Sequence, residues 1–232
     1  MDTIELTKKN ARIAGLYYLG IIIFGMYSEF FVRGSLIDHS SAQNTLMLIE
    51  NNLMQWRSGL VSDMVCQVFF LFLGLHLYRM LKQTNQIAAR MMLLCIVLGV
   101  GVTFVNLLHH FAPVILLGSD MDLDSTTQAS LMLFFIKLHG QGYTIAGVFF
   151  GLWLYPLGVM VRQSGVFPPV LGWLLMIGCF GYLIDTVVVF QIPSEPWITY
   201  PGLLVALVAE FGFCFYLLII GIKTKRHEPT HT

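Results

Sequence analysis

Charged residues are scarce in this chain. They make up 11% of its 232 residues, whereas a soluble globular domain carries about 25%. The formal net charge is zero, and no basic tract indicates binding to nucleic acid. Hydrophobic residues make up 56% of the chain, and its mean hydropathy is +0.75. So little charge cannot cover a water-soluble surface, and the composition therefore indicates a membrane protein.

Cysteine is also rare, and familiar catalytic motifs are missing. The four cysteines lie in apolar runs without a CxxC pair, which disfavours both disulfides and a thiolate metal site. The sequence contains neither HExxH nor GxSxG, so it lacks the short signatures of zinc proteases and of serine hydrolases. No stretch alternates polar and apolar residues with a period of two, and strands are not expected.

Apolar segments long enough to cross a bilayer, which takes about 20 residues, occur six times. They cover residues 11–32, 57–80, 88–117, 127–160, 168–191 and 200–222. We therefore predict an all-α polytopic membrane bundle of six transmembrane helices, which forms a single domain over residues 1–232. Between the first two spans, Leu46, Ile49 and Leu53 recur at helical spacing in a polar stretch. This pattern predicts one short interfacial helix.

Lysine and arginine are distributed unevenly among the loops. If the N-terminus is cytoplasmic, ten of the thirteen lie on the inner side. These are Lys8, Lys9, Arg12, Arg79, Lys82, Arg90, Arg162, Lys223, Lys225 and Arg226. The positive-inside rule then predicts that both termini are cytoplasmic. The acidic loop with Asp120, Asp122 and Asp124 faces outward in this topology. The first apolar run lacks a small-residue cleavage site after it, so we interpret it as a retained span.

Polar side chains interrupt every span, nearly all of them in the predicted outer half of the bilayer. They are Glu29, Arg33, Asp63, Gln67, Asn106, His109, His110, Lys137, His139, Tyr143, Asp185 and Glu210. A charged side chain at the bilayer centre costs about 2.5–3.5 kcal/mol on insertion scales. We therefore expect these groups to face the bundle interior and to meet in a shared polar chamber.

The most polar interruption is KLHGQGY at residues 137–143. His139 and Tyr143 are four residues apart and share one helix face. Gly140 and Gly142 thin the same helix and let a neighbouring helix or a ligand approach the imidazole. His139 is therefore our candidate proton-transfer or ligating group.

We assign candidate roles to the remaining polar residues from their predicted depth in the bilayer. The candidate catalytic set is His139, Asp63, Asp185 and Glu210. The candidate ligand-binding set is Glu29, Arg33, Arg57, Asn106, His110 and Tyr143, with Arg33 or Arg57 as a contact for an anionic group. We attribute the aromatic residues near span ends to the aromatic belt and assign them no chemical role. They are Tyr17, Tyr18, Trp56, Trp197 and Tyr200.

These residues leave several activities open. We favour binding or processing of a small amphipathic or lipid-like molecule. The alternatives are a proton-coupled carrier of a small solute and a structural or partner-binding membrane protein whose polar core only fixes helix register. No cofactor is identified. Zinc is an alternative, with ligands such as His139, His109 and Asp185 or with His110 and another carboxylate, and it depends on convergence of separate helices.

Several stretches resemble one known family. They are ARIAGLYYL, EFFVRGSLI, KLHGQGYTIAGVFFGLWLYPLG, PPVLGWLLMIGCFGYLIDTVV and AEFGFCFYLLIIGIK. Together they resemble the bacterial integral-membrane family of domain of unknown function 4386, from about Ala11 to Lys223. LHGQGY and GYLID are the most specific pieces. The resemblance implies a multi-pass protein of the bacterial plasma (inner) membrane without an agreed activity.

The resemblance also matches individual positions. Residues at family-like positions are Arg33, His139, Gly142, Asp185 and Glu210. Lys137 departs from the family pattern, because members carry a neutral or acidic residue there. The resemblance thus supports a role for His139 more than one for Lys137.

Overall fold

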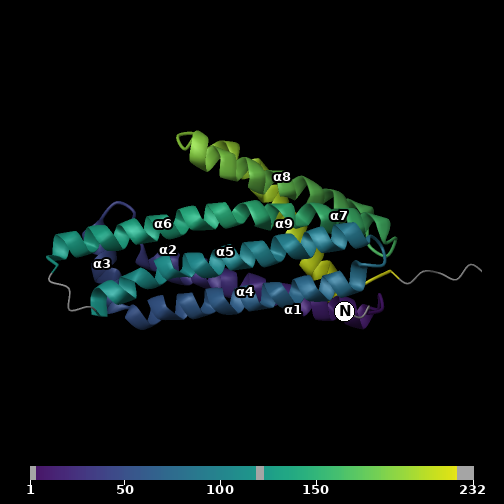
Figure 1. Ribbon diagram of the computed structural model, residues 1–232, viewed down its shortest axis with the longest axis horizontal. Coiled ribbons are helices and arrows are strands. Elements are labelled where there is room, and N and C mark those ends of the chain that lie inside the picture. The colour runs from purple at the N-terminus through teal and green to yellow at the C-terminus, as the bar shows by residue number, and fades with distance from the viewer. Residues whose placement is uncertain (1–3, 119–122, 224–232) are drawn as a thin grey trace, which may run out of the picture.

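The computed structural model describes residues 4–118 and 123–223, and the part of the chain that it describes contains helices but no strand (Figure 1). Within those residues, six helical segments are long and apolar enough to cross a membrane. They are Lys8–Leu36, Leu53–Leu81, Gln86–Gly118, Ser125–Gln163, Pro169–Gln191 and Pro196–Ile219. Each overlaps one predicted span, so the predicted all-α, six-span fold is confirmed. Asp120, Asp122, Lys225 and Arg226 lie outside the described residues.

The first span changes its helical geometry near its end. Helix α1 (Lys8–Met26) continues into a π-helical turn, η1 (Tyr27–Arg33), and into the short α2 (Gly34–Leu36). In the π-helical turn, the Gly34 amide donates to the Glu29 carbonyl, five residues back. Such turns widen a helix by one residue and often occur at functional sites. Here the turn carries Glu29 and Arg33.

A short helix follows in the connection to the second span. Helix α3 (Ala42–Asn51) begins after Ser41, whose hydroxyl accepts a hydrogen bond from the Asn44 amide at 3.2 Å. Leu46 and Ile49, predicted as its apolar face, are buried in a cluster with Trp56. The helix therefore covers one end of the bundle. Its position relative to the bilayer surface stays a prediction.

The other helices form the body of the bundle. They are α4 (Leu53–Leu81), α5 (Gln86–Gly118), α6 (Ser125–Leu152), α7 (Leu154–Gln163), α8 (Pro169–Gln191), η2 (Pro196–Ile198) and α9 (Tyr200–Ile219). Helix α5 packs between α4 and α6, and α8 packs against both α7 and α9. The fourth span is interrupted at Trp153, three residues before Pro156, whose ring cannot donate the helical hydrogen bond. Helix α8 diverges from α6 toward its C-terminal end (Figure 1).

Polar residues separate two apolar clusters along the bundle. The smaller cluster includes Trp56 of α4, and the larger one includes Phe70 of the same helix. Asp63 lies between them. Helix α5 meets the two clusters in the reverse order, with the buried His110 between them. A band of buried polar side chains therefore lies between two apolar regions.

Candidate functional site

A buried ion pair lies at the centre of the polar band. Arg33 Nη1 donates to Asp63 Oδ2 at 2.6 Å and to Ser28 Oγ at 2.8 Å. Arg33 Nε donates to Glu29 Oε2 at 2.9 Å. Asp63 is fully buried, whereas the Glu29 side chain is 62% exposed. The π-helical turn thus joins an accessible carboxylate to a buried one through a single guanidinium.

Two imidazoles face this ion pair, and each is oriented by a backbone carbonyl. His110 Nε2 lies 3.2 Å from the Trp56 carbonyl oxygen, and His139 Nδ1 lies 3.2 Å from that of Asn106. Because a carbonyl only accepts, those ring nitrogens carry the hydrogens. His110 Nδ1 then presents its lone pair to Arg33 Nη1 at 3.5 Å. His139 Nε2 is buried without a hydrogen-bond partner in the described part of the chain.

Trp56 fixes the position of His110. Its Nε1 donates to the His110 carbonyl at 2.9 Å, and the two rings stack with centroids 4.3 Å apart. Trp56 is therefore a buried structural contact of the site, and its assignment to the aromatic belt is wrong. A tryptophan near a span end cannot be distinguished from a belt residue by sequence position alone.

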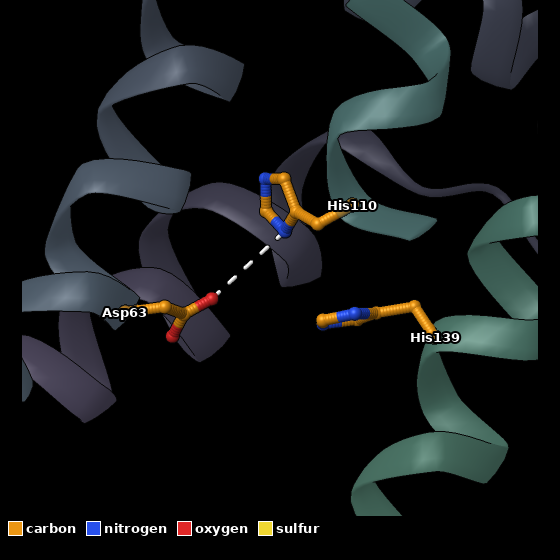
Figure 2. A group of neighbouring side chains, drawn as sticks. All are labelled: Asp63, His110 and His139. Atoms are coloured by element: carbon orange, nitrogen blue, oxygen red, sulfur yellow. Dashed lines mark ion pairs between the residues drawn. The ribbon is translucent and has the colours of Figure 1, made fainter. Parts of the chain in front are cut away.

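Asp63, His110 and His139 form a group of potential metal ligands. One ligand atom from each lies within 4.8 Å of the others, and Figure 2 shows the two rings and the carboxylate converging from three helices. Two histidines, a carboxylate and backbone-oriented imidazoles are a donor set that suits zinc in kind. However, Arg33 Nη1 already bridges Asp63 Oδ2 and His110 Nδ1. The positive charge of the group is thus supplied by the guanidinium.

Tyr143 closes the cluster on the side of α6. Its hydroxyl donates to Asp63 Oδ1 at 3.3 Å. Its ring centroid lies 5.4 Å from Arg33 Cζ and 5.1 Å from the His139 ring. The predicted common face of His139 and Tyr143 therefore points into the polar band.

Gly142 allows α5 to approach this part of α6. Asn106 Nδ2 donates to the His139 carbonyl at 2.8 Å, and a Cβ added at Gly142 would collide with the Asn106 side chain. Gly140 has open space at the same place. Of the two glycines predicted to admit a neighbour, Gly142 is the one that does so.

Glu210 belongs to a second polar group. Tyr18 donates to Glu210 Oε2 at 3.0 Å, and Tyr182 donates to Oε1 at 2.8 Å. Tyr18 is only 2% exposed, so the attribution of this residue to the aromatic belt is also wrong. Tyr182 was not singled out in the sequence, although it lies in the GYLID stretch three residues before Asp185.

Two adjoining cavities connect the two polar groups. One, of about 290 Å³, is lined by Gln67, Phe70, Trp153 and Glu210 among others. The other, of about 800 Å³, is lined by His39, His139 and Leu203 among others. Both are lined by Glu29, Arg33, Tyr143 and Tyr182. These four residues form the wall that the cavities share.

Four of the predicted polar residues lie elsewhere. Asp185 lines a separate small cavity of about 190 Å³ with Gln141 and Thr199. Arg57 and Lys137 are exposed. His109 Nδ1 lies 2.9 Å from Asn106 Oδ1, and its ring stacks on Phe135. The structure therefore does not bring His109 and Asp185 together with His139 as zinc ligands; His110 and Asp63 lie there instead.

A further cavity, of about 570 Å³, has a different character. It lies between α5, α7 and α8, and its lining, which includes Met91, Pro156 and Phe180, is almost entirely apolar. Such a groove suits hydrocarbon, and the described residues that line it include no carboxylate, histidine, lysine or arginine. The polar band remains the candidate site.

The fold and the polar band define a multi-pass membrane protein with a buried charged cluster. The model of a family described as a domain of unknown function (DUF4386) matches residues 13–221. The chain belongs to this family. No curated protein and no solved structure matches the chain.

Proposed function

We propose that the protein binds a small amphipathic molecule in the two adjoining cavities beside the polar band. The supporting observation is that buried polar side chains line these cavities, Arg33 and Gln67 in the smaller one and Arg33 and His139 in the larger one. Burial of an arginine, an aspartate and two histidines does not stabilise membrane-spanning helices by itself. Intramembrane ionisable groups usually mark functional sites. The combination of apolar walls and a few convergent polar groups is typical of ligand pockets.

His139 is the proposed contact for the polar part of the bound molecule. Its Nε2 lone pair is buried and unpartnered among the described residues, and the residue lines the larger cavity. A buried acceptor without a partner is costly. A donor group on the bound molecule would supply that partner. Tyr143 packs against the His139 ring and donates to Asp63, so these two residues would keep the imidazole in position. Asp185 and Arg57 have no role in the proposed binding.

Extraction of the purified protein tests this proposal. Wild-type protein and His139→Leu are purified in a neutral detergent, and their small-molecule extracts are compared by mass spectrometry. We expect one species, near one per chain in the wild type, to be depleted in His139→Leu. His109→Leu is the matched control, because it removes an imidazole that lines neither cavity.

Thermal unfolding of the same samples separates the structural alternative. If His139→Leu unfolds earlier while no extract contains an enriched species, the polar band only holds the helices together. Tyr143→Phe, which removes a single hydroxyl, provides a second variant that keeps the ring. Equal amounts of the species in His139→Leu, Tyr143→Phe and wild type would overturn the proposed binding site.

A further inference from the structure

Positively charged side chains are scarce in the lining of the two cavities. Arg33 is the only lysine or arginine among the described residues that line them. Its guanidinium already donates to Glu29, Asp63 and Ser28. An anionic ligand at Arg33 would also meet the carboxylates of Glu29 and Asp63, whose negative charges oppose its binding. This arrangement argues against our expectation that Arg33 contacts an anion.

Unused acceptors lie in the walls of the same space. Gln67 Oε1 and His139 Nε2 are buried without hydrogen-bond partners in the described part of the chain, and the residues are 4% and 3% exposed. Gln67 lines the smaller cavity and His139 the larger one. Unpaired buried acceptors favour a ligand that brings N–H or O–H donors.

The Glu210 end of the smaller cavity adds a negative charge and aromatic walls. Tyr18, Phe70, Trp153 and Tyr182 line this cavity with Glu210. The Trp153 ring lies 5.9 Å from Tyr18 and 5.1 Å from Phe70, measured between ring centroids. Aromatic faces attract organic cations, and a carboxylate beside them strengthens that preference.

We infer that the smaller cavity accepts the ammonium group of a small organic amine, with Glu210 as counter-ion, Gln67 as hydrogen-bond acceptor and the aromatic rings as walls. This inference rests on the proposed function and specifies the class of ligand. The cavity of about 290 Å³ is near the lower end of the roughly 300–1,000 Å³ of typical ligand pockets. The ligand is therefore small, and its apolar part contacts rings rather than a long groove.

Three probes of similar shape test the charge preference. Phenethylammonium, 2-phenylethanol and 3-phenylpropanoate share an aromatic ring on a short chain and differ in the charge of the polar group. Each is titrated into the full-length protein in a neutral detergent, and binding is measured by calorimetry. We expect phenethylammonium to bind at least about tenfold more tightly than the alcohol, because a charge-assisted contact replaces a neutral one.

Variants assign that preference to the residues. Glu210→Gln keeps the size of the side chain and should remove most of the preference for the ammonium. Gln67→Leu should weaken phenethylammonium more than the alcohol, which provides a second test if Glu210→Gln does not fold. Asp185→Asn is the matched control, since it removes a carboxylate of α8 that lines a different cavity, and it should bind all probes as the wild type does.

The outcomes separate this inference from the proposed function. If the alcohol or the propanoate binds as tightly as the ammonium, the amine inference is wrong and the binding cavity stands. If no probe binds while zinc chloride alone does, the acceptors belong to a metal site and the amine inference is wrong. If no probe binds and the protein extracts contain no enriched species, both proposals fail.

Discussion

At the scale of single residues, the Arg33–Asp63 ion pair dominates the polar band. Both side chains are nearly inaccessible, at 10% and 1% exposure, so neither charge has water to stabilise it. The desolvation of two charges is repaid only by close pairing and further hydrogen bonds. Ser28 and Tyr143 provide such bonds. Loss of either charge therefore costs more than the pair itself contributes.

Removal of Arg33 alone should destabilise the protein strongly. Arg33→Met leaves the buried Asp63 carboxylate unpaired, and we expect a loss of about 3–5 kcal/mol, as for other broken buried pairs. Arg33→Met combined with Asp63→Asn removes the stranded charge and should recover part of that loss. Unfolding in a denaturing detergent measures the three variants. A double variant less stable than Arg33→Met would contradict this account.

The sequence reveals the members of the band better than their partners. Intramembrane ionisable residues are visible in a sequence because they interrupt apolar runs, and this signal located Arg33, Asp63 and His139. Adjacent residues of a helix point about 100° apart, so only one of His109 and His110 could face the centre. The helix rotation that selects His110 is set by its stacking on Trp56, which no local pattern reveals.

At the scale of elements, the contact between α5 and α6 depends on one glycine. Gly142→Ala would place a methyl group in the Asn106 side chain, and we expect a loss of about 1–3 kcal/mol from overpacking. Gly140→Ala is the matched control on the same helix, where a Cβ meets no other group within 4 Å. It should be neutral or stabilising by up to about 1 kcal/mol through helix propensity.

Thermal unfolding of the two alanine variants compares them directly. The difference between them removes effects of alanine on the helix itself. If Gly142→Ala were as stable as Gly140→Ala, the close approach of α5 and α6 at Asn106 would not exist.

The π-helical turn η1 could not be predicted from its sequence, YSEFFVR. Ordinary α-helical spacing suggested that Glu29 and Arg33 pair one turn apart, and this contact is present. The additional residue in the turn also allows Ser28 to accept from the same guanidinium. The contact of Arg33 with Asp63 on α4 is tertiary, and the local sequence does not reveal it.

Asp38 gives the α2–α3 connection a dependence on pH. Hydrogen bonds from the Ser40 and Asn44 side chains lower the pKa of Asp38 from 3.8 to about 2. Because the pKa is lower in the folded chain than in the unfolded one, the carboxylate stabilises the folded state above pH 3.8. That contribution is lost as the pH falls toward 2.

The prediction for Asp38 is measured by unfolding between pH 2 and pH 5. Asp38→Asn should lower the midpoint at pH 5 and flatten its decline toward pH 2. Glu50→Gln, a change of an exposed carboxylate on α3, is the control and should keep the wild-type decline. An equal decline in Asp38→Asn and wild type would show that Asp38 does not contribute.

At the scale of the whole molecule, the number of spans was predictable, whereas the grouping of the polar residues was not. Hydropathy along the chain is a one-dimensional signal and gives the six spans. The polar residues divide into the Arg33 group and the Glu210 group, which share a cavity. Asp185 is separate because it lines another cavity with Gln141 and Thr199, and no sequence pattern indicates which face of α8 it occupies.

Orientation in the membrane decides which side supplies the ligand, and cysteine labelling tests it. Glu50 on α3 and Gln83 between α4 and α5 are exposed, and the four native cysteines are buried, so background labelling should be low. By the positive-inside rule, a membrane-impermeant maleimide should label Glu50→Cys in intact cells and Gln83→Cys only after permeabilisation.

The larger cavity is lined by His39, close to α3, and would then open toward the outer face. The reverse labelling pattern would place its opening in the cytoplasm, and the ligand would have to be an intracellular molecule.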